Sequence, residues 1–235
     1  MGNFNAVTIM MSCLTLVVIV IIIFLKYKKL QDKPKLWKVF LVLLFGMFAI
    51  SYNWNFQDVV VRLPILPLGV WILLFVFRNK KERWLVYRPF AWLGFFSLFL
   101  FILTTLLTIP INKVFYPKDE LSTYIANVDD ASIIATHPSA ESRSLNKENL
   151  ANEISEMEQE EIYSDQWYGE MTRNIDTAAI DERFPYQLTG SSAKFGSGVV
   201  RVIYVEKDGR GLLITTPKGQ YYFRSDDSLF RGGNQ

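Results

Sequence analysis

Cysteine and histidine are almost missing from this chain of 235 residues, which has one of each, Cys13 and His137. A disulfide needs two cysteines, so none can form within the chain. The C-terminal half has no cysteine although we expect it to face an oxidising compartment. This combination favours a bacterial cell surface, above all a Gram-positive plasma membrane. A lone histidine without neighbouring ligands also gives no basis for a metal site.

Charged residues are missing from the interior of four long apolar stretches in the first half of the chain. These stretches cover about residues 7–25, 37–54, 59–77 and 89–111. Because about 20 helical residues cross a bilayer, the pattern predicts an all-α bundle of four transmembrane helices within residues 1–111. Ionisable groups inside the bilayer are typical of transporters and pumps, so a channel or transporter acting alone is not expected.

The third apolar stretch is the least certain of the four to span. Arg62, Pro64 and Pro67 lie near its outer end, so the helix is expected to begin near Leu66, where a proline in the first turn costs little. The second and third stretches then form a helical hairpin. With three spans instead of four, the C-terminal half would lie in the cytoplasm.

Small and polar residues inside the stretches suggest no dimer interface. Gly46, Gly69 and Gly94 stand one per stretch without a second small residue at the spacing of a dimerisation motif. Thr104 and Thr105 could bond a neighbouring helix, but we expect their hydroxyls to bond back to their own helix.

The distribution of charge orients the chain in the membrane. Residues 1–112 carry 12 Lys and Arg against 3 Asp and Glu, and residues 113–235 carry 13 against 20. The basic residues gather in loops 26–38 and 78–88, which are predicted to be cytoplasmic, with the N-terminus and the chain beyond Ile111 outside. The first stretch lacks the features of a cleaved signal and is expected to remain as a helix. Proximity to anionic lipid headgroups explains the basicity, so no nucleic-acid partner is predicted.

The segment 112–164 is acidic and reads as a linker followed by a marginal amphipathic helix. Leu150, Ile154 and Met157 recur at helical spacing within residues 146–163, surrounded by glutamates. The stripe is narrow, so this helix needs a surface to pack on. That surface is its own domain in the simpler interpretation and a partner protein in the other.

Residues 165–235 are predicted to form a small α+β outer domain with an antiparallel three-stranded meander. The expected strands cover residues 199–205, 212–216 and 221–224. Asp208-Gly209 is a strong hairpin signal between the first two strands. Three strands bury too little alone, so Phe184, Tyr186 and Phe195 are expected to cover one face of the sheet.

Residues capable of chemistry are few and scattered, and no catalytic, cofactor-binding or metal-binding residue is predicted. His137 lies in a loop, and Ser192 and Lys194 do not have the spacing of a Ser/Lys catalytic pair. Two further features are weak. The acidic pairs lack a calcium-loop pattern, and an aromatic pair is a candidate contact site that packing against the sheet explains more simply. These are Asp129-Asp130, Asp226-Asp227 and Trp167-Tyr168.

The sequence therefore predicts a multi-pass plasma-membrane protein, not an enzyme, with an acidic extracytoplasmic C-terminal domain. Its expected role is that of an accessory, sensory or interaction protein. Its partners would be the lipid bilayer and another membrane or cell-surface protein. The alternative is a subunit or immunity factor of a membrane transport or export complex. A membrane enzyme using Ser192, Lys194 or His137 is a third and weaker hypothesis.

Overall fold

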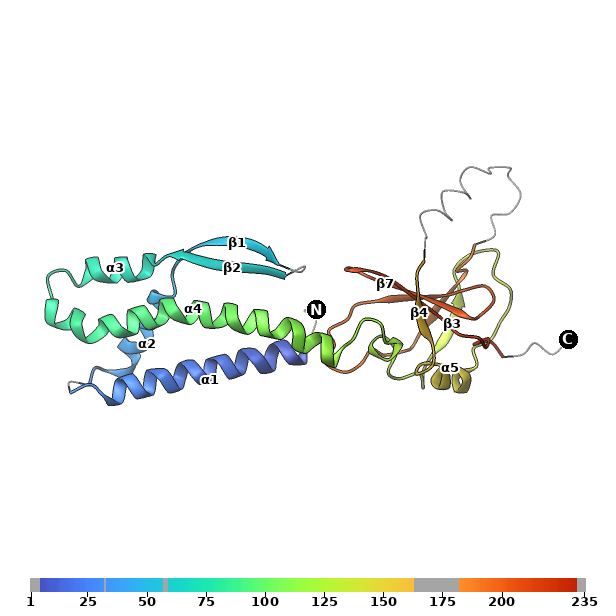
Figure 1. Ribbon diagram of the computed structural model, residues 1–235, viewed down its shortest axis with the longest axis horizontal. Coiled ribbons are helices and arrows are strands. Elements are labelled where there is room, and N and C mark those ends of the chain that lie inside the picture. Colours follow the sequence, from blue (N-terminus) through green and yellow to red (C-terminus); the bar gives the residue numbers. More distant parts are fainter. Residues whose placement is uncertain (1–4, 32, 57–58, 163–181, 232–235) are drawn as a thin grey trace, which may run out of the picture. The chain divides into compact units, whose positions relative to one another are not determined.

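The computed structural model describes residues 5–31, 33–56, 59–162 and 182–231, and it divides the chain into two compact units (Figure 1). The apolar unit comprises residues 7–111. The sheet unit comprises residues 112–235 together with residues 1–6.

Two long helices of the apolar unit agree with the predicted first and fourth spans. Helix α1 covers Ala6–Lys28 and helix α4 covers Lys81–Phe115. At 1.5 Å per residue they measure about 35 and 52 Å. Both are long and apolar enough to cross a membrane. Helix α4 begins eight residues before the apolar stretch at 89 and carries Pro89 and Pro110 within it.

The middle of the apolar unit differs from the predicted helical hairpin. Helix α2 covers Leu36–Gly46 and helix α3 covers Leu68–Val76, so their lengths are about 16 and 14 Å, half of what a span needs. Between them, β1 (Ile50–Phe56) and β2 (Val59–Leu66) form an antiparallel hairpin. Among the described residues, two helices are long enough to span a membrane, and the predicted four transmembrane helices are not confirmed.

The sequence explains why the hairpin replaces helix. Residues 50–56 read Ile-Ser-Tyr-Asn-Trp-Asn-Phe, which alternates apolar and polar residues with the period of a strand. Val59, Val60 and Val61 are β-branched and suit a strand, and Pro64 would break a helix that continued through it. Helix α3 starts at Leu68, directly after Pro67 and close to the predicted position.

Glycines bring α2 close to α3 and α4. A Cβ atom at Gly46 would overlap the Ala91 carbonyl oxygen, and one at Gly94 would overlap the Leu43 carbonyl oxygen. A Cβ at Gly69 would overlap the carbonyl oxygen of Phe45. These glycines thus mark close contacts between helices of the same chain.

Helices α1 and α4 are linked by threonines. The hydroxyls of Thr15 and Thr104 lie within hydrogen-bond distance of each other. Thr104 also donates to the Leu100 carbonyl oxygen at 2.8 Å, and Thr105 donates to the Phe101 carbonyl oxygen at 2.9 Å. The expected bonding to the own helix is confirmed for both residues, and Thr104 makes the contact between helices in addition.

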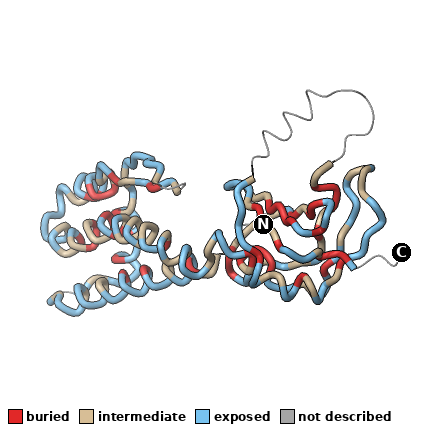
Figure 2. The backbone as a smooth tube through the Cα atoms, turned by 45° about the vertical axis from the view of Figure 1, so that its right-hand side comes forward, coloured by how far each residue is buried: buried red, intermediate tan, exposed pale blue. Residues whose placement is uncertain are grey.

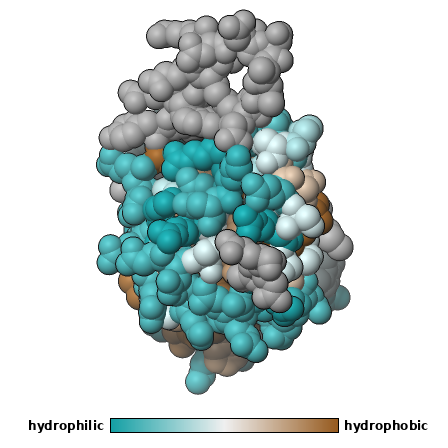
Figure 3. All heavy atoms as spheres, turned by 90° about the vertical axis from the view of Figure 1, so that its right-hand side faces the viewer, coloured by the Kyte–Doolittle hydropathy of each residue, from teal (hydrophilic) through white to brown (hydrophobic). Residues whose placement is uncertain are grey.

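The apolar unit exposes much of its hydrophobic surface, whereas the sheet unit buries its own (Figure 2). Val20, Phe40 and Phe75 keep 62%, 61% and 72% of their surface exposed. Water would be a poor solvent for such a surface, which indicates membrane association. The colouring of Figure 3 shows the sheet unit's face toward the viewer as predominantly hydrophilic.

The described part of the sheet unit contains six antiparallel strands in the order β3-β5-β6-β7-β8-β4. The three predicted strands are present as β6 (Val202–Val205), β7 (Gly211–Thr216) and β8 (Gly219–Arg224). The prediction of a sheet with only three strands is wrong. Strands β3 (Ser132–Ala135) and β5 (Tyr186–Thr189) extend one side, and β4 (Glu158–Glu160) extends the other.

The predicted helix over residues 146–163 is correct only at its start. Helix α5 covers Lys147–Glu153, with the Asn146 side chain accepting a hydrogen bond from the Asn149 backbone N–H. Residues Glu158–Glu160 instead form β4, whose exposed acidic side chains disfavour pairing of this sheet edge with another chain. Pairing with β8 satisfies the backbone groups on one side of β4. The crowded glutamates do not favour a helix end.

The main core of the sheet unit combines the strands with the segment before them. Leu121, Ile125 and Leu150, all from the segment predicted as linker and marginal helix, are buried against Ile214 and Phe223. Leu121 belongs to a short 3-10 helix, η1 (Leu121–Thr123). Tyr186 lies in the same core and Phe184 in a smaller cluster on Tyr222, whereas Phe195 is 85% exposed and covers no strand.

Candidate functional site

The β1–β2 hairpin is the most unusual surface of the apolar unit. Tyr52 and Trp54 on β1 are 61% and 45% exposed, and the Trp54 and Phe56 rings lie 5.3 Å apart between centroids. Figure 1 shows the hairpin running beside the second half of α4. The hairpin thus presents an aromatic strand on the outside of the apolar unit.

The hairpin lies at the depth of the apolar stretch of α4. A cavity of about 420 Å³ is lined by Ser51 and Arg62 of the hairpin and by Leu98, Ile102 and Thr105 of α4, among others. These α4 residues occupy the middle of the stretch 89–111, so Arg62 starts closer to the apolar centre than the sequence suggested. Its side chain is exposed and long enough to extend away from that level.

The sheet formed by β1 and β2 has two strands, so each strand keeps one open edge among the described residues. Backbone N–H and C=O groups without partners cost several kcal/mol each in hydrocarbon, and open sheet edges facing lipid are not found in membrane proteins. A hairpin at this depth therefore needs a cover for its edges. Another polypeptide supplies such a cover by adding a strand or by packing polar groups along it.

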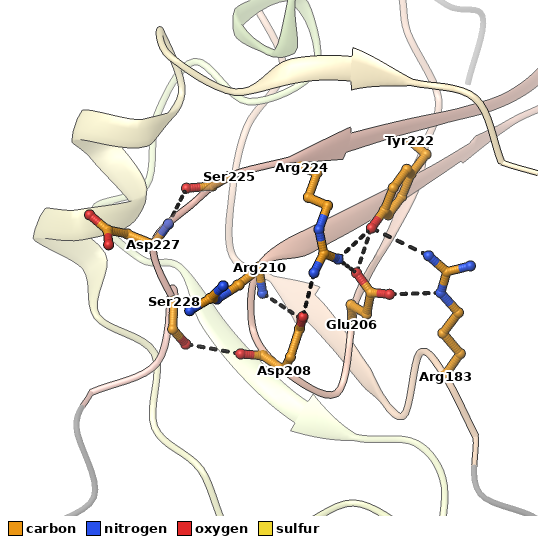
Figure 4. A network of polar contacts seen from close by, with 9 residues as sticks. All are labelled: Arg183, Glu206, Asp208, Arg210, Tyr222, Arg224, Ser225, Asp227 and Ser228. Carbon is orange, nitrogen blue, oxygen red and sulfur yellow. Dashed lines mark hydrogen bonds and ion pairs between the residues drawn. The ribbon is translucent and has the colours of Figure 1, made fainter.

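A second polar feature lies in the sheet unit, centred on Glu206 (Figure 4). Glu206 is 8% exposed and accepts from Arg183 Nε at 2.7 Å, from Arg224 Nη1 at 2.5 Å and from the Tyr222 hydroxyl at 2.5 Å. Arg224 also donates through Nη2 to Asp208 at 2.8 Å. Two arginines and two carboxylates thus balance each other.

The network around Glu206 joins strands that are distant in sequence. Glu206 and Asp208 lie at the turn between β6 and β7, whereas Tyr222 and Arg224 lie on β8 and Arg183 precedes β5. A Cβ atom at Gly211 would overlap a carboxylate oxygen of Glu206, so glycine makes room for it. Both oxygens of Glu206 have partners, which indicates that the network stabilises the turn.

Burial sets the protonation of Tyr222. Removal from water raises the pKa of the Tyr222 hydroxyl, and its hydrogen bond to Glu206 raises it further, while Arg224 opposes the shift. The hydroxyl therefore remains a donor to Glu206 over a wide pH range. Tyr124, buried in the main core beside Tyr221, also has a raised pKa because of desolvation.

A glycine-rich loop, residues 190–198, holds the two ends of the long helices within the sheet unit. The Ala6 N–H, at the start of α1, donates to the Gly196 carbonyl oxygen at 2.8 Å. Lys194 Nζ donates to the Phe115 carbonyl oxygen at 3.0 Å at the end of α4. The Asn5 side chain donates to Asn112 at 3.0 Å and to the Ser197 carbonyl oxygen at 3.1 Å.

The fold does not bring together His137, Ser192 and Lys194, the residues of the weaker enzyme hypothesis. His137 Nδ1 lies 2.8 Å from the Ser139 hydroxyl in a local turn. Ser192 pairs through its backbone with Asn127, and Lys194 is engaged with Phe115 as described. Among the residues that the structure describes, no group of three metal-ligating side chains is found.

The acidic pairs have local roles in turns. The Asp129 carboxylate accepts from the Asn127 side chain at 2.8 Å, and the Asp227 N–H donates to the Ser225 hydroxyl at 3.0 Å. Trp167-Tyr168 lies outside the described residues.

Two features of these sites escaped the sequence analysis. The hairpin had a signal, the strict alternation of residues 50–56, which the overall hydropathy of the stretch obscured. The Glu206 network had none, because its five members come from three separate segments and no short motif connects them.

Comparison with known protein families, with curated proteins and with solved structures finds no match to this chain.

Proposed function

We propose that this chain is an interaction protein of a bacterial plasma membrane whose β1–β2 hairpin contacts another membrane protein. Its sheet unit lies outside the cytoplasm and its basic loops lie inside. The observation that carries the proposal is the pair of open strand edges beside the middle of α4. Because lipid cannot satisfy those backbone groups, a polypeptide partner is the cover that physical chemistry favours.

The exposed rings of the hairpin support the same conclusion. Aromatic residues are enriched in the centres of protein interfaces because they bury a large area with few rotatable bonds. Tyr52 and Trp54 stand on β1 and keep 61% and 45% of their surface exposed, so a partner can reach them.

The contacts of the N-terminus support placing both chain ends on one side. Asn5 and Ala6 bind the loop at Gly196 and Ser197, so an even number of crossings separates Ala6 from Asn112. In Figure 1 the α1–α2 and α3–α4 connections lie at one end of the apolar unit. These are the two lysine- and arginine-rich loops, for which the cytoplasm is the favoured side.

Photo-crosslinking in native membranes tests the proposed contact. Benzoylphenylalanine replaces Tyr52 or Trp54 on the hairpin, and Phe24 of α1, which is 63% exposed, serves as the matched control. We expect a discrete protein adduct from positions 52 and 54 and lipid adducts alone from position 24. If the hairpin positions also yield only lipid adducts, the proposal is wrong.

A reporter fused after Gln235 tests the sidedness separately. A reporter that is active only outside the cytoplasm should be active, and its cytoplasmic counterpart should be silent. The reverse pattern would place the sheet unit inside and overturn the extracytoplasmic assignment while leaving the hairpin contact open to the crosslinking test.

One observation favours the alternative of a subunit or immunity factor of a transport or export complex. Ser51, Arg62 and Thr105 line the cavity between the hairpin and α4, so polar groups are available at the level of the bilayer. A second chain could complete a polar path there. Altered secretion or permeability in a deletion strain, restored by a chain without its sheet unit, would favour this alternative over the interaction protein.

A further inference from the structure

A second cavity lies at the opposite end of the apolar unit, where the two basic loops meet. Its volume is about 530 Å³, within the range of small-molecule sites. The connector before α2, helix α2, the end of α3 and the first turns of α4 all contribute to its wall. The cavity therefore collects residues from both basic loops, 26–38 and 78–88.

The cavity has a cationic part and an apolar part. Lys33, Lys38 and Arg83 supply three positive charges, and none of the described lining residues is acidic. None of the three forms an ion pair with a described residue. The remaining lining is apolar or aromatic, with Leu41 and Leu73 as examples.

Aromatic packing and one hydrogen bond hold the wall in shape. The Phe77 ring stacks on Tyr87 at 5.6 Å and on Trp84 at 6.3 Å between centroids. Lys38 Nζ lies 5.5 Å from the centre of the Trp37 ring. The Tyr27 hydroxyl donates to the Pro34 carbonyl oxygen at 2.9 Å, which fixes the connector against α1.

We propose that this cavity binds the headgroup and upper acyl chains of an anionic phospholipid. Lys33, Lys38 and Arg83 attract a phosphate because no carboxylate lies among the described lining residues, and basic pockets between membrane helices bind anionic headgroups by this means. The apolar wall matches acyl carbon, which a soluble anion does not offer. The inference rests on the apolar unit lying in a bilayer, but it does not depend on the partner proposed for the hairpin.

Native mass spectrometry of the full chain in non-ionic detergent tests the site. The probes are phosphatidylglycerol, phosphatidylcholine and inorganic phosphate, each added alone. We expect phosphatidylglycerol to bind at least tenfold more tightly than phosphatidylcholine, and inorganic phosphate not to be retained. Equal binding of the two lipids would overturn the proposal, and retention of inorganic phosphate as tightly as phosphatidylglycerol would replace the lipid with a soluble anion.

Charge variants locate the binding. Lys38→Gln with Arg83→Gln should weaken phosphatidylglycerol binding by about thirtyfold, since each cation near an anionic surface contributes roughly a factor of five. Lys26→Gln with Arg88→Gln removes the same charge from positions outside the lining and should change binding less than threefold. An equal loss in both double variants would mean diffuse attraction to the basic loops and would refute a defined site.

A variant that fills the cavity tests the site without removing any charge. It keeps the test valid if the charge variants fail to fold. Leu41 lines the cavity and is 41% exposed, so Leu41→Trp can fill the space without disturbing a buried contact. We expect this variant to lose at least ten-fold in phosphatidylglycerol binding while keeping the elution volume of the parent chain. Undiminished binding by a folded Leu41→Trp variant would place the lipid elsewhere.

Discussion

Replacing Glu206 by alanine should loosen the sheet unit more than any exposed acidic substitution. Arg183 would lose its ion pair with Glu206, and Arg224 would keep its ion pair with Asp208 and its hydrogen bond to the Tyr222 hydroxyl. Breaking a fully buried ion pair costs ~3–5 kcal/mol. The two arginine side chains are 31% exposed, so water can partly replace the lost carboxylate. We therefore expect a loss of about 2 kcal/mol in the free energy of local unfolding.

Hydrogen exchange of the full chain in detergent measures this loss where it arises. A change of about 2 kcal/mol should speed the exchange of protected amides in β6, β7 and β8 about thirtyfold. Glu206→Gln keeps the shape and one acceptor, so its effect should be about half as large in free energy. The control Glu158→Gln removes an exposed carboxylate from the edge strand β4 and should stay within about 0.5 kcal/mol. If Glu206→Ala accelerates exchange less than threefold, or no more than the control, the network does not stabilise the turn.

Two further predictions concern a helix contact and a titration. Gly94→Leu should force α2 away from α4, because the new side chain meets the Leu43 carbonyl oxygen. Overpacking of about 2 kcal/mol should lower the melting temperature in detergent by about 6 °C. An unchanged melting temperature would contradict the contact. Tyr222→Phe should reduce the loss of folding stability that the parent chain shows as the pH rises into the alkaline range. The folded-state pKa of Tyr222 is raised, so the parent chain is at full stability below the unfolded value of about 10 and loses it as pH rises beyond that. Thermal unfolding followed by circular dichroism between pH 8 and 11 measures this, and parallel curves for the two chains would refute it.

Local sequence patterns predicted much of the fold where neighbouring residues decide the structure. The apolar runs of α1 and α4 are continuous, so hydropathy alone located both helices. Asp208-Gly209 placed the turn between β6 and β7, because the turn geometry is set by the residues in it.

The prediction failed where an apolar segment could form either a helix or a strand. Hydropathy cannot distinguish helix from strand at residues 50–66, and the alternation of Tyr52 and Trp54 with asparagines was the only local sign of the hairpin. Residues 158–160 became a strand because β8 offered its edge, a partner more than sixty residues away. Of the proposed sites, the basic loops were visible in sequence, but the cavity that they share was not.

The sequence by itself determined that one half of the chain is apolar, that its basic residues gather in two loops, and that no disulfide can form within this chain, since each depends on composition and order alone. Tertiary structure decided which distant residues meet. It joined Lys38 to Arg83 in one cavity, surrounded Glu206 with two arginines, and left a strand edge open beside α4. These arrangements depend on long-range packing and pairing, which local patterns do not encode.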